Sequence, residues 1–142
     1  MKGLPLILAF LMFFPVAPPS TAAPKIVTAA QVNGTWRTPA GEFKVLALGQ
    51  QQLRIEFSGI DAYRVNGEWT ANTGTGAGIA FIAGDTATFR PEGADEDCAI
   101  TMRFAAGALR VTQEGDCGFG HHVTAIGTYR KVSARKPAFS GD

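Results

Sequence analysis

The fold is decided by the stretch at residues 97–117, which reads DCAITMRFAAGALRVTQEGDC. Apolar and polar residues alternate on both sides of a small-residue break, and this period of two is typical of strands with one buried face. A two-residue turn at Gly107-Ala108 would place Cys98 opposite Cys117, and a turn at Ala106-Gly107 would make them diagonal neighbours. Either turn predicts an antiparallel hairpin with both cysteines at its open end.

The N-terminus has the layout of a secretory signal peptide. A positively charged start at residues 1–3 precedes an apolar run at residues 4–16, and Ser20 and Ala22 are small residues at the −3 and −1 positions of a cleavage site. The apolar run is shorter than the ~20 residues that a membrane-spanning helix needs. We therefore expect residues 1–22 to be removed and the protein to be periplasmic or secreted, without membrane insertion after cleavage.

Export bears directly on the cysteines. Cys98 and Cys117 are the only two in the sequence, and an oxidising compartment favours a bond between them. The close C-x-x-C spacing of redox-active pairs is absent from the sequence. We expect a structural disulfide that closes the hairpin.

The two-residue period recurs along the chain in short runs that turn signals such as Asn66-Gly67 separate. The expected strands are residues 34–37, 41–48, 52–57, 61–72, 77–82, 86–90, 97–104, 109–114 and 121–130. They predict an all-β domain at residues 23–131, a small closed antiparallel barrel of about eight strands, with a β-sandwich as the alternative. Residues 132–142 are expected to form a disordered tail.

Bulky apolar residues at the alternating positions are expected to fill the barrel and to leave no roomy cavity. These interior candidates are Phe43, Val45, Leu53, Ile55, Phe57, Ile79, Phe81, Phe89, Ile100, Met102, Phe104, Leu109, Val111 and Tyr129.

The charges are balanced, with 13 Lys and Arg against 12 Asp and Glu. Loss of Lys2 with the signal peptide leaves the mature chain with no net charge, which excludes a strongly basic nucleic-acid-binding protein. Two local excesses of charge remain, one negative and one positive. Residues 92–97 form an acidic loop that could steer the protein toward a basic partner, and residues 130–136 form a small basic patch.

The sequence Gly34-Thr35-Trp36 precedes the first long strand. It resembles the G-x-W signature near the start of lipocalins and other calycins, in which the Trp closes one end of an eight-stranded barrel and an Arg near the last strand packs across it. The resemblance implies that Trp36 and Arg130 are structural residues that close the barrel. The alternative is that Trp36 is an ordinary core residue.

Residues 73–78, TGTGAG, form a small-residue stretch that we expect to be a flexible hairpin tip. The stretch resembles the Ser-Gly-rich loop of periplasmic C-type lysozyme inhibitors, which are small disulfide-clasped β-barrels. In that family a short loop enters the lysozyme cleft, so the resemblance implies that the hydroxyls of Thr73 and Thr75 meet the catalytic carboxylates. Where the family has a basic or aromatic residue after the loop, this chain has Ile79-Ala80-Phe81.

Residues 116–122, DCGFGHH, combine two glycines, an aromatic residue and two histidines. Adjacent histidines on a strand point to opposite faces and cannot chelate one ion together, so we expect no metal and no cofactor. An Asp116–His121 pair lacks an identifiable Ser or Cys nucleophile, so we expect no catalytic residues. Phe119, His121 and His122 are candidate binding residues instead.

These features favour an exported, non-enzymatic binding protein that acts through barrel-rim loops and inhibits a partner enzyme such as lysozyme. The candidate contacts are Thr73, Thr75, Phe119, His121 and His122. A lipocalin-like carrier of a small apolar ligand is the first alternative, and a small periplasmic enzyme is the second. The partner is expected to be a protein or a small apolar ligand rather than a nucleic acid.

Overall fold

The computed structural model describes residues 3, 14–19 and 26–142, so most of the predicted signal peptide lies outside the described residues. The described chain has one short helix and eight strands. They are α1 (Ala29–Val32), β1 (Gly34–Thr38), β2 (Gly41–Gly49), β3 (Gln52–Val65), β4 (Glu68–Ala83), β5 (Thr86–Phe89), β6 (Ala99–Ala105), β7 (Ala108–Glu114) and β8 (Gly127–Ser133).

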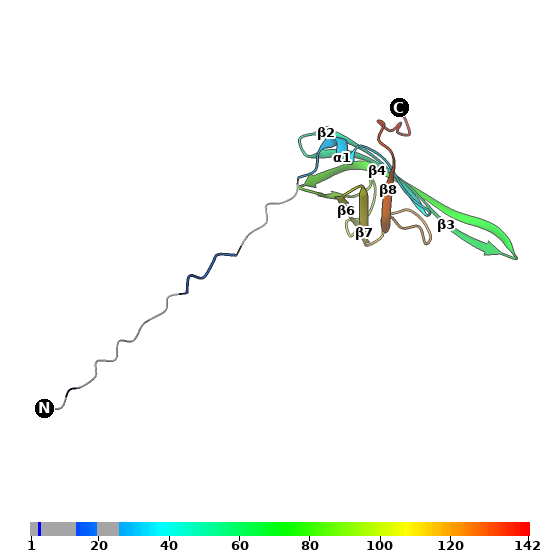
Figure 1. The fold of residues 1–142 in the computed structure, drawn as a ribbon. Helices are drawn as coiled ribbons and strands as arrows, with labels where there is room; N and C mark the ends of the chain where they lie inside the picture. Colours follow the sequence, from blue (N-terminus) through cyan, green and yellow to red (C-terminus); the bar gives the residue numbers. More distant parts are fainter. Residues whose placement is uncertain (1–2, 4–13, 20–25) are drawn as a thin grey trace.

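The eight strands form a closed antiparallel barrel (Figure 1). Each strand pairs with the next one in the sequence, and β8 returns to pair with β1. Closure leaves the wall of the barrel without an unpaired edge strand. The predicted small closed barrel is therefore confirmed, and the β-sandwich alternative is wrong.

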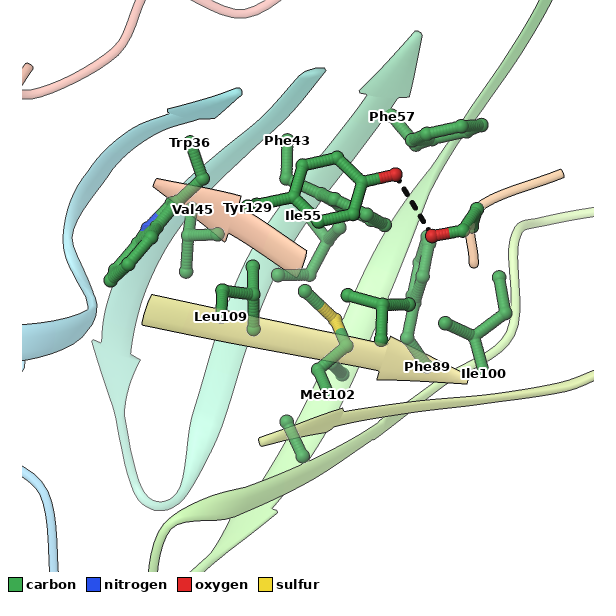
Figure 2. Packing of buried hydrophobic residues seen from close by; sticks show 14 of the residues in the cluster. Trp36, Phe43, Val45, Ile55, Phe57, Phe89, Ile100, Met102, Leu109 and Tyr129 are labelled. Atoms are coloured by element: carbon green, nitrogen blue, oxygen red, sulfur yellow. Dashed lines mark hydrogen bonds between the residues drawn. The ribbon is translucent and has the colours of Figure 1, made fainter. Parts of the chain in front are cut away.

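Side chains fill the interior of the barrel (Figure 2). Aromatic rings contact one another through its middle, with the ring centroids of Phe43 and Phe57 4.8 Å apart and those of Phe43 and Tyr129 5.0 Å apart. The Tyr129 hydroxyl donates a 2.8 Å hydrogen bond to the carbonyl of Ala125, and burial raises the pKa of this tyrosine. Twelve of the fourteen predicted interior residues are buried: Phe43, Val45, Leu53, Ile55, Phe57, Phe89, Ile100, Met102, Phe104, Leu109, Val111 and Tyr129.

Ile79 and Phe81 are the two predicted interior residues that lie outside. Their side chains are 41% and 60% exposed. Side chains alternate between the two sides of a strand, and on β4 the inward positions belong to Gly78 and Ala80. The inward side has little room there, because a Cβ at Gly78 would already lie 3.4 Å from the ring of Phe89.

The hairpin of β6 and β7 has the second of the two predicted registers. Ala105 pairs with Ala108, so the turn is Ala106-Gly107, and both turn residues have positive φ angles of 47° and 77°. Cys98 and Cys117 are bonded, with their Cα atoms 5.0 Å apart. The predicted disulfide is confirmed, and it is compatible with an extracellular or periplasmic protein.

The last predicted strand is wrong over its first half. Residues 121–126 form a loop, and β8 begins at Gly127. The alternation that suggested a strand is real, since Val123 and Ala125 are buried. The amide of Ala125, however, donates to the side chain of Gln113 rather than to a neighbouring strand.

The helix α1 covers one end of the barrel. Trp36 is 1% exposed there, its Nε1 donates to the carbonyl of Val32, and its ring packs edge-on against Phe104. The cation over the Trp36 ring is Lys131, at 4.9 Å, and not the predicted Arg130. Tyr129 and Lys131 share one side of β8, so Arg130 points outward and is exposed.

The end of the chain packs against the outside of β3 instead of forming the predicted disordered tail. We call residues 137–142 the strap. Phe139 is 5% exposed beneath the guanidinium of Arg54, which lies 4.1 Å from its ring centroid. Arg54 also pairs with Asp142 at 3.0 Å.

Glu56 anchors the same strap from within the sheet. It is 8% exposed, and its carboxylate accepts a 2.8 Å hydrogen bond from the amide of Ser140 and a 3.0 Å bond from Lys44. Burial alone would raise the pKa of Glu56, but the Ser140 amide and the Lys44 ammonium together hold it below its ordinary value of 4.5. The pKa of Asp142 is also lowered, first by its bond to Arg54.

Removal of the disulfide should destabilise the barrel. Replacing Cys98 and Cys117 with alanine frees a loop with a sequence separation of 19 residues, and the entropy of that loop in the unfolded chain corresponds to about 3 kcal/mol. Urea denaturation of the double variant and the natural chain measures the difference. Equal unfolding midpoints would contradict the expectation.

Acidification should release the strap before the barrel unfolds. Both carboxylates have lowered pKa values in the folded state, so their contribution to stability is complete above their ordinary values of 4.5 and 3.8 and is lost as pH falls through the folded values. The Ser140 amide should then lose protection from hydrogen exchange as the pH falls below the ordinary pKa values of both carboxylates. In the Glu56→Gln/Asp142→Asn variant, protection should be low already at neutral pH. Protection that persists through acid in the natural chain would show that these carboxylates do not hold the strap.

Candidate functional site

A two-stranded arm projects from the barrel (Figure 1). The pairing of β3 with β2 ends before the arm begins, whereas its pairing with β4 continues through six pairs, from Ile60–Thr73 to Val65–Glu68. Six pairs extend about 20 Å at the usual rise of a strand. We call residues 60–73 the arm.

The tip of the arm is a two-residue turn at Asn66-Gly67. Both residues have positive φ angles, 50° and 83°, as a type I′ turn requires. The predicted single strand at residues 61–72 is therefore wrong, because the chain reverses in its middle. Two strands of one hairpin share this segment.

Both faces of the arm carry exposed apolar side chains. Ile60 and Trp69 lie on the face that continues the outer surface of the barrel, and they are 41% and 67% exposed. Tyr63 and Val65 lie on the opposite face, 40% and 51% exposed. The guanidinium of Arg64 lies 4.4 Å from the centroid of the Trp69 ring.

The small-residue stretch at residues 73–78 is not the flexible tip that the sequence suggested. It forms the middle of β4, at the base of the arm, where Thr73 pairs with Ile60 and Thr75 with Ser58. Both threonines are exposed on the outer face. Thr73 is thus the last residue of the arm and Thr75 lies in the barrel wall, so neither hydroxyl lies at a projecting tip.

Gly74 and Gly76, which follow these two threonines, face inward and allow a close contact with the loop at residues 115–126. A Cβ on Gly74 would collide with the backbone carbonyl of Phe119, and one on Gly76 would lie 2.7 Å from the Phe119 ring. Phe119 is 2% exposed, and its ring centroid is 4.6 Å from that of Phe57. Phe119 is therefore a buried anchor that fixes this loop to the base of the arm, and its side chain is not available to a partner.

The two histidines lie on the exposed side of the same loop. His122 has a φ angle of 58°, so the backbone reverses and the rings of His121 and His122 stack, with centroids 3.9 Å apart. The expectation that they point to opposite faces is wrong because the segment is not a strand. His122 Nδ1 is 3.7 Å from the carboxylate of Asp61 on the arm. Across the part of the chain that the structure describes, no three His, Cys, Asp or Glu side chains gather as a metal site.

Six exposed carboxylates lie on the two segments that the disulfide joins, residues 92–97 and residues 114–116. We call them the acidic collar: Glu92, Asp95, Glu96, Asp97, Glu114 and Asp116. None of them forms an ion pair with another described residue.

The clefts that could take a small apolar ligand lie at the other end of the barrel, around α1. One of about 290 Å³ is lined by Trp36, Phe104 and Lys131, and another of about 320 Å³ is lined by Val32, Leu53 and neighbouring residues. Both open to the surface. The interior between them and the arm is occupied by the aromatic core (Figure 2).

Comparisons with known protein families, with curated proteins and with solved structures found no match to this chain. Within residues 3, 14–19 and 26–142, no helix has the length and apolar character needed to cross a bilayer.

The sequence-based search for a site missed the apolar residues of the arm. A signal for them was present: Asn66-Gly67 is a strong hairpin signal, and runs with a period of two flank it on both sides. Extended from this turn, the register pairs Val65 with Glu68 and continues without a break to Gln52 and Phe81. A hairpin of that length exceeds what a small barrel can enclose.

Adding one methyl group at the base of the arm should destabilise the fold. Gly74→Ala places a Cβ against the Phe119 backbone, and such overpacking typically costs about 1–3 kcal/mol. Thr75→Ala, one residue away on the exposed face, is the matched control and should change stability by less than about 0.5 kcal/mol. Thermal denaturation measures the stability of both variants. Equal melting temperatures for Gly74→Ala and Thr75→Ala would mean that the loop does not pack on Gly74.

Proposed function

We propose that the chain is an exported, non-enzymatic binding protein whose arm enters a cleft of a partner protein, with an enzyme inhibited by this occlusion as the principal case. One observation carries the proposal: apolar side chains are exposed on both faces of the arm, Ile60 and Trp69 on one and Tyr63 and Val65 on the other. A flat surface can cover only one face of a ribbon. A cleft covers both.

The exposed apolar side chains of the arm favour a complex in which a partner covers them. A two-stranded ribbon alone is marginally stable in water, and four large apolar side chains on it face solvent. A partner that buries them gains the hydrophobic free energy that the isolated arm lacks. Trp, Tyr and Arg are also the residue types that dominate binding energies at interfaces, and the arm has one of each, Trp69, Tyr63 and Arg64.

The size of the arm fits a standard protein interface. A ribbon about 20 Å long, about 10 Å wide and about 10 Å thick has a lateral surface of about 800 Å². Stable complexes bury about 800 Å² on each partner. The arm alone can therefore supply one side of such an interface.

The scaffold supports an inhibitor because it pre-orders the arm. The anchor Phe119 and the disulfide between Cys98 and Cys117 fix the loops at the base of the arm. Less conformational entropy is then lost on binding, which strengthens the complex. If the partner is a lysozyme, the element that would enter its cleft is the arm, since Thr75 lies in the barrel wall and Thr73 lies at the foot of the arm, away from its tip.

The two alternatives have less support. A carrier needs a site for its apolar ligand, but the barrel interior is filled with side chains, and the two clefts around α1 are open to the surface. An enzyme needs an acid–base group positioned in a cleft. His122 is exposed and its nitrogen is 3.7 Å from Asp61, which is longer than a hydrogen bond.

The test is inhibition of lysozyme by the purified exported chain and by two variants. Tyr63→Ala/Trp69→Ala removes the aromatic contacts of the arm and should weaken inhibition about 30-fold, the equivalent of ~2 kcal/mol. Phe81→Ala is the matched control, because Phe81 is an exposed aromatic residue on β4 outside the arm, and inhibition should not change.

Loss of inhibition in the control, or its survival in the arm variant, would contradict the role of the arm. Full lysozyme activity at micromolar natural chain would exclude lysozyme as the partner. The same pair of variants then applies to proteins captured from the periplasmic or secreted fraction. Equal capture by the arm variant and the natural chain would contradict the proposed function itself.

A further inference from the structure

The charges around the arm identify the chemistry of the partner. Resting on the proposed function, we propose that the arm docks into a protein cleft with a basic rim, and that the acidic collar faces this rim when the arm is inserted.

The first part of the collar begins at Glu92, which lies against the strands that lead into the arm. The amide of Glu92 donates a 2.8 Å hydrogen bond to the carbonyl of Ala77 on β4, and Glu92 lines a surface groove with Ser58 and Thr75. Residues 95–97 follow in the same loop. Any cleft that receives the arm down to its base must therefore bring its rim close to these carboxylates.

The second half is joined to the first at the disulfide. Glu114 and Asp116 flank Gly115, and a Cβ on this glycine would collide with the carbonyl of Asp97. Cys117 follows at once and is bonded to Cys98. The two loops thus form one cross-linked acidic border, which continues through Phe119 to the inner face of the arm.

This border has more carboxylates than nearby cations. The sequence has no Lys or Arg at residues 91–102 or 111–129. The nearest basic residue in the chain, Arg90, donates its guanidinium hydrogens to the backbone carbonyls of Glu96 and Cys98. On the arm, the single basic side chain is Arg64, which lies over Trp69. The end of the molecule that bears the arm is therefore acidic.

The excess of negative charge favours some of the partners that could cover an apolar arm and disfavours others. Carboxylates in excess over nearby cations repel an anionic membrane surface and an acidic cleft, because bringing like charges together destabilises the contact. A basic rim is attracted over about 8 Å at physiological ionic strength. The collar therefore rejects the anionic surfaces to which an exposed Trp and Tyr would otherwise adsorb.

Collar and arm should then control different rates. Charges at the border of an interface act mainly on the association rate, whereas buried aromatic contacts act mainly on the dissociation rate. Neutralising the collar should slow association about tenfold or more at low salt and weaken its dependence on ionic strength. Truncating the arm should speed dissociation.

The experiment compares four immobilised chains: the natural chain, Glu92→Gln/Asp95→Asn/Glu96→Gln, the charge-preserving Glu92→Asp/Asp95→Glu/Glu96→Asp, and the arm variant Tyr63→Ala/Trp69→Ala. Each is exposed to the periplasmic or secreted fraction and to vesicles of pure phosphatidylglycerol. We expect proteins whose capture needs the arm to be basic, to elute with salt, and to be lost by the neutralised chain but retained by the charge-preserving one.

The possible failures are distinguishable. Arm-dependent proteins that are acidic, or that the neutralised chain captures equally well, would overturn the basic rim and leave the proposed function standing. Vesicle binding that depends on the arm would overturn it in favour of a lipid surface. If no protein depends on the arm for its capture, the proposed function fails, and this inference fails with it.

Discussion

The structure around the arm depends on one close contact, in which the backbone of Phe119 lies against Gly74. The absence of a side chain at Gly74 lets the loop at residues 115–126 reach the inner face of β4. This contact buries the Phe119 ring against Phe57 and brings His122 toward Asp61 on the arm. Without it, the barrel would have an open end where it now has a rigid base for a projecting hairpin.

The barrel could be predicted from sequence because each of its signals is local. Alternation at residues 98–104 defines a strand, and a turn at residues 106–107 fixes the register that brings the cysteines together. The core prediction was wrong at two positions of β4, where a neighbouring side chain limits which residues can face inward. Ile79 and Phe81 have the right residue type for a core, but the Phe89 ring leaves room only for small residues on the inward side of β4.

The candidate site was harder to predict because its parts are distant in sequence. The arm residue Trp69, the collar residue Asp95 and the loop residue His121 meet at one end of the barrel only through strand register and a disulfide. The glycines at 74 and 76 indicated flexibility when taken alone. In the fold they are strand residues whose missing side chains accommodate another segment, and single-sequence patterns do not distinguish these two uses of glycine.

The pairing of β1 with β8 also constrains how the chain folds. Thr35 pairs with Ser133, so the two strands that close the barrel come from opposite ends of the domain. Folding rates fall as contacts become more distant in sequence. Closure must therefore wait until nearly the whole domain is synthesised, while the hairpins β3–β4 and β6–β7 can form early from local contacts. The arm belongs to one of these local units, so its apolar side chains are exposed during folding as well as in the finished protein.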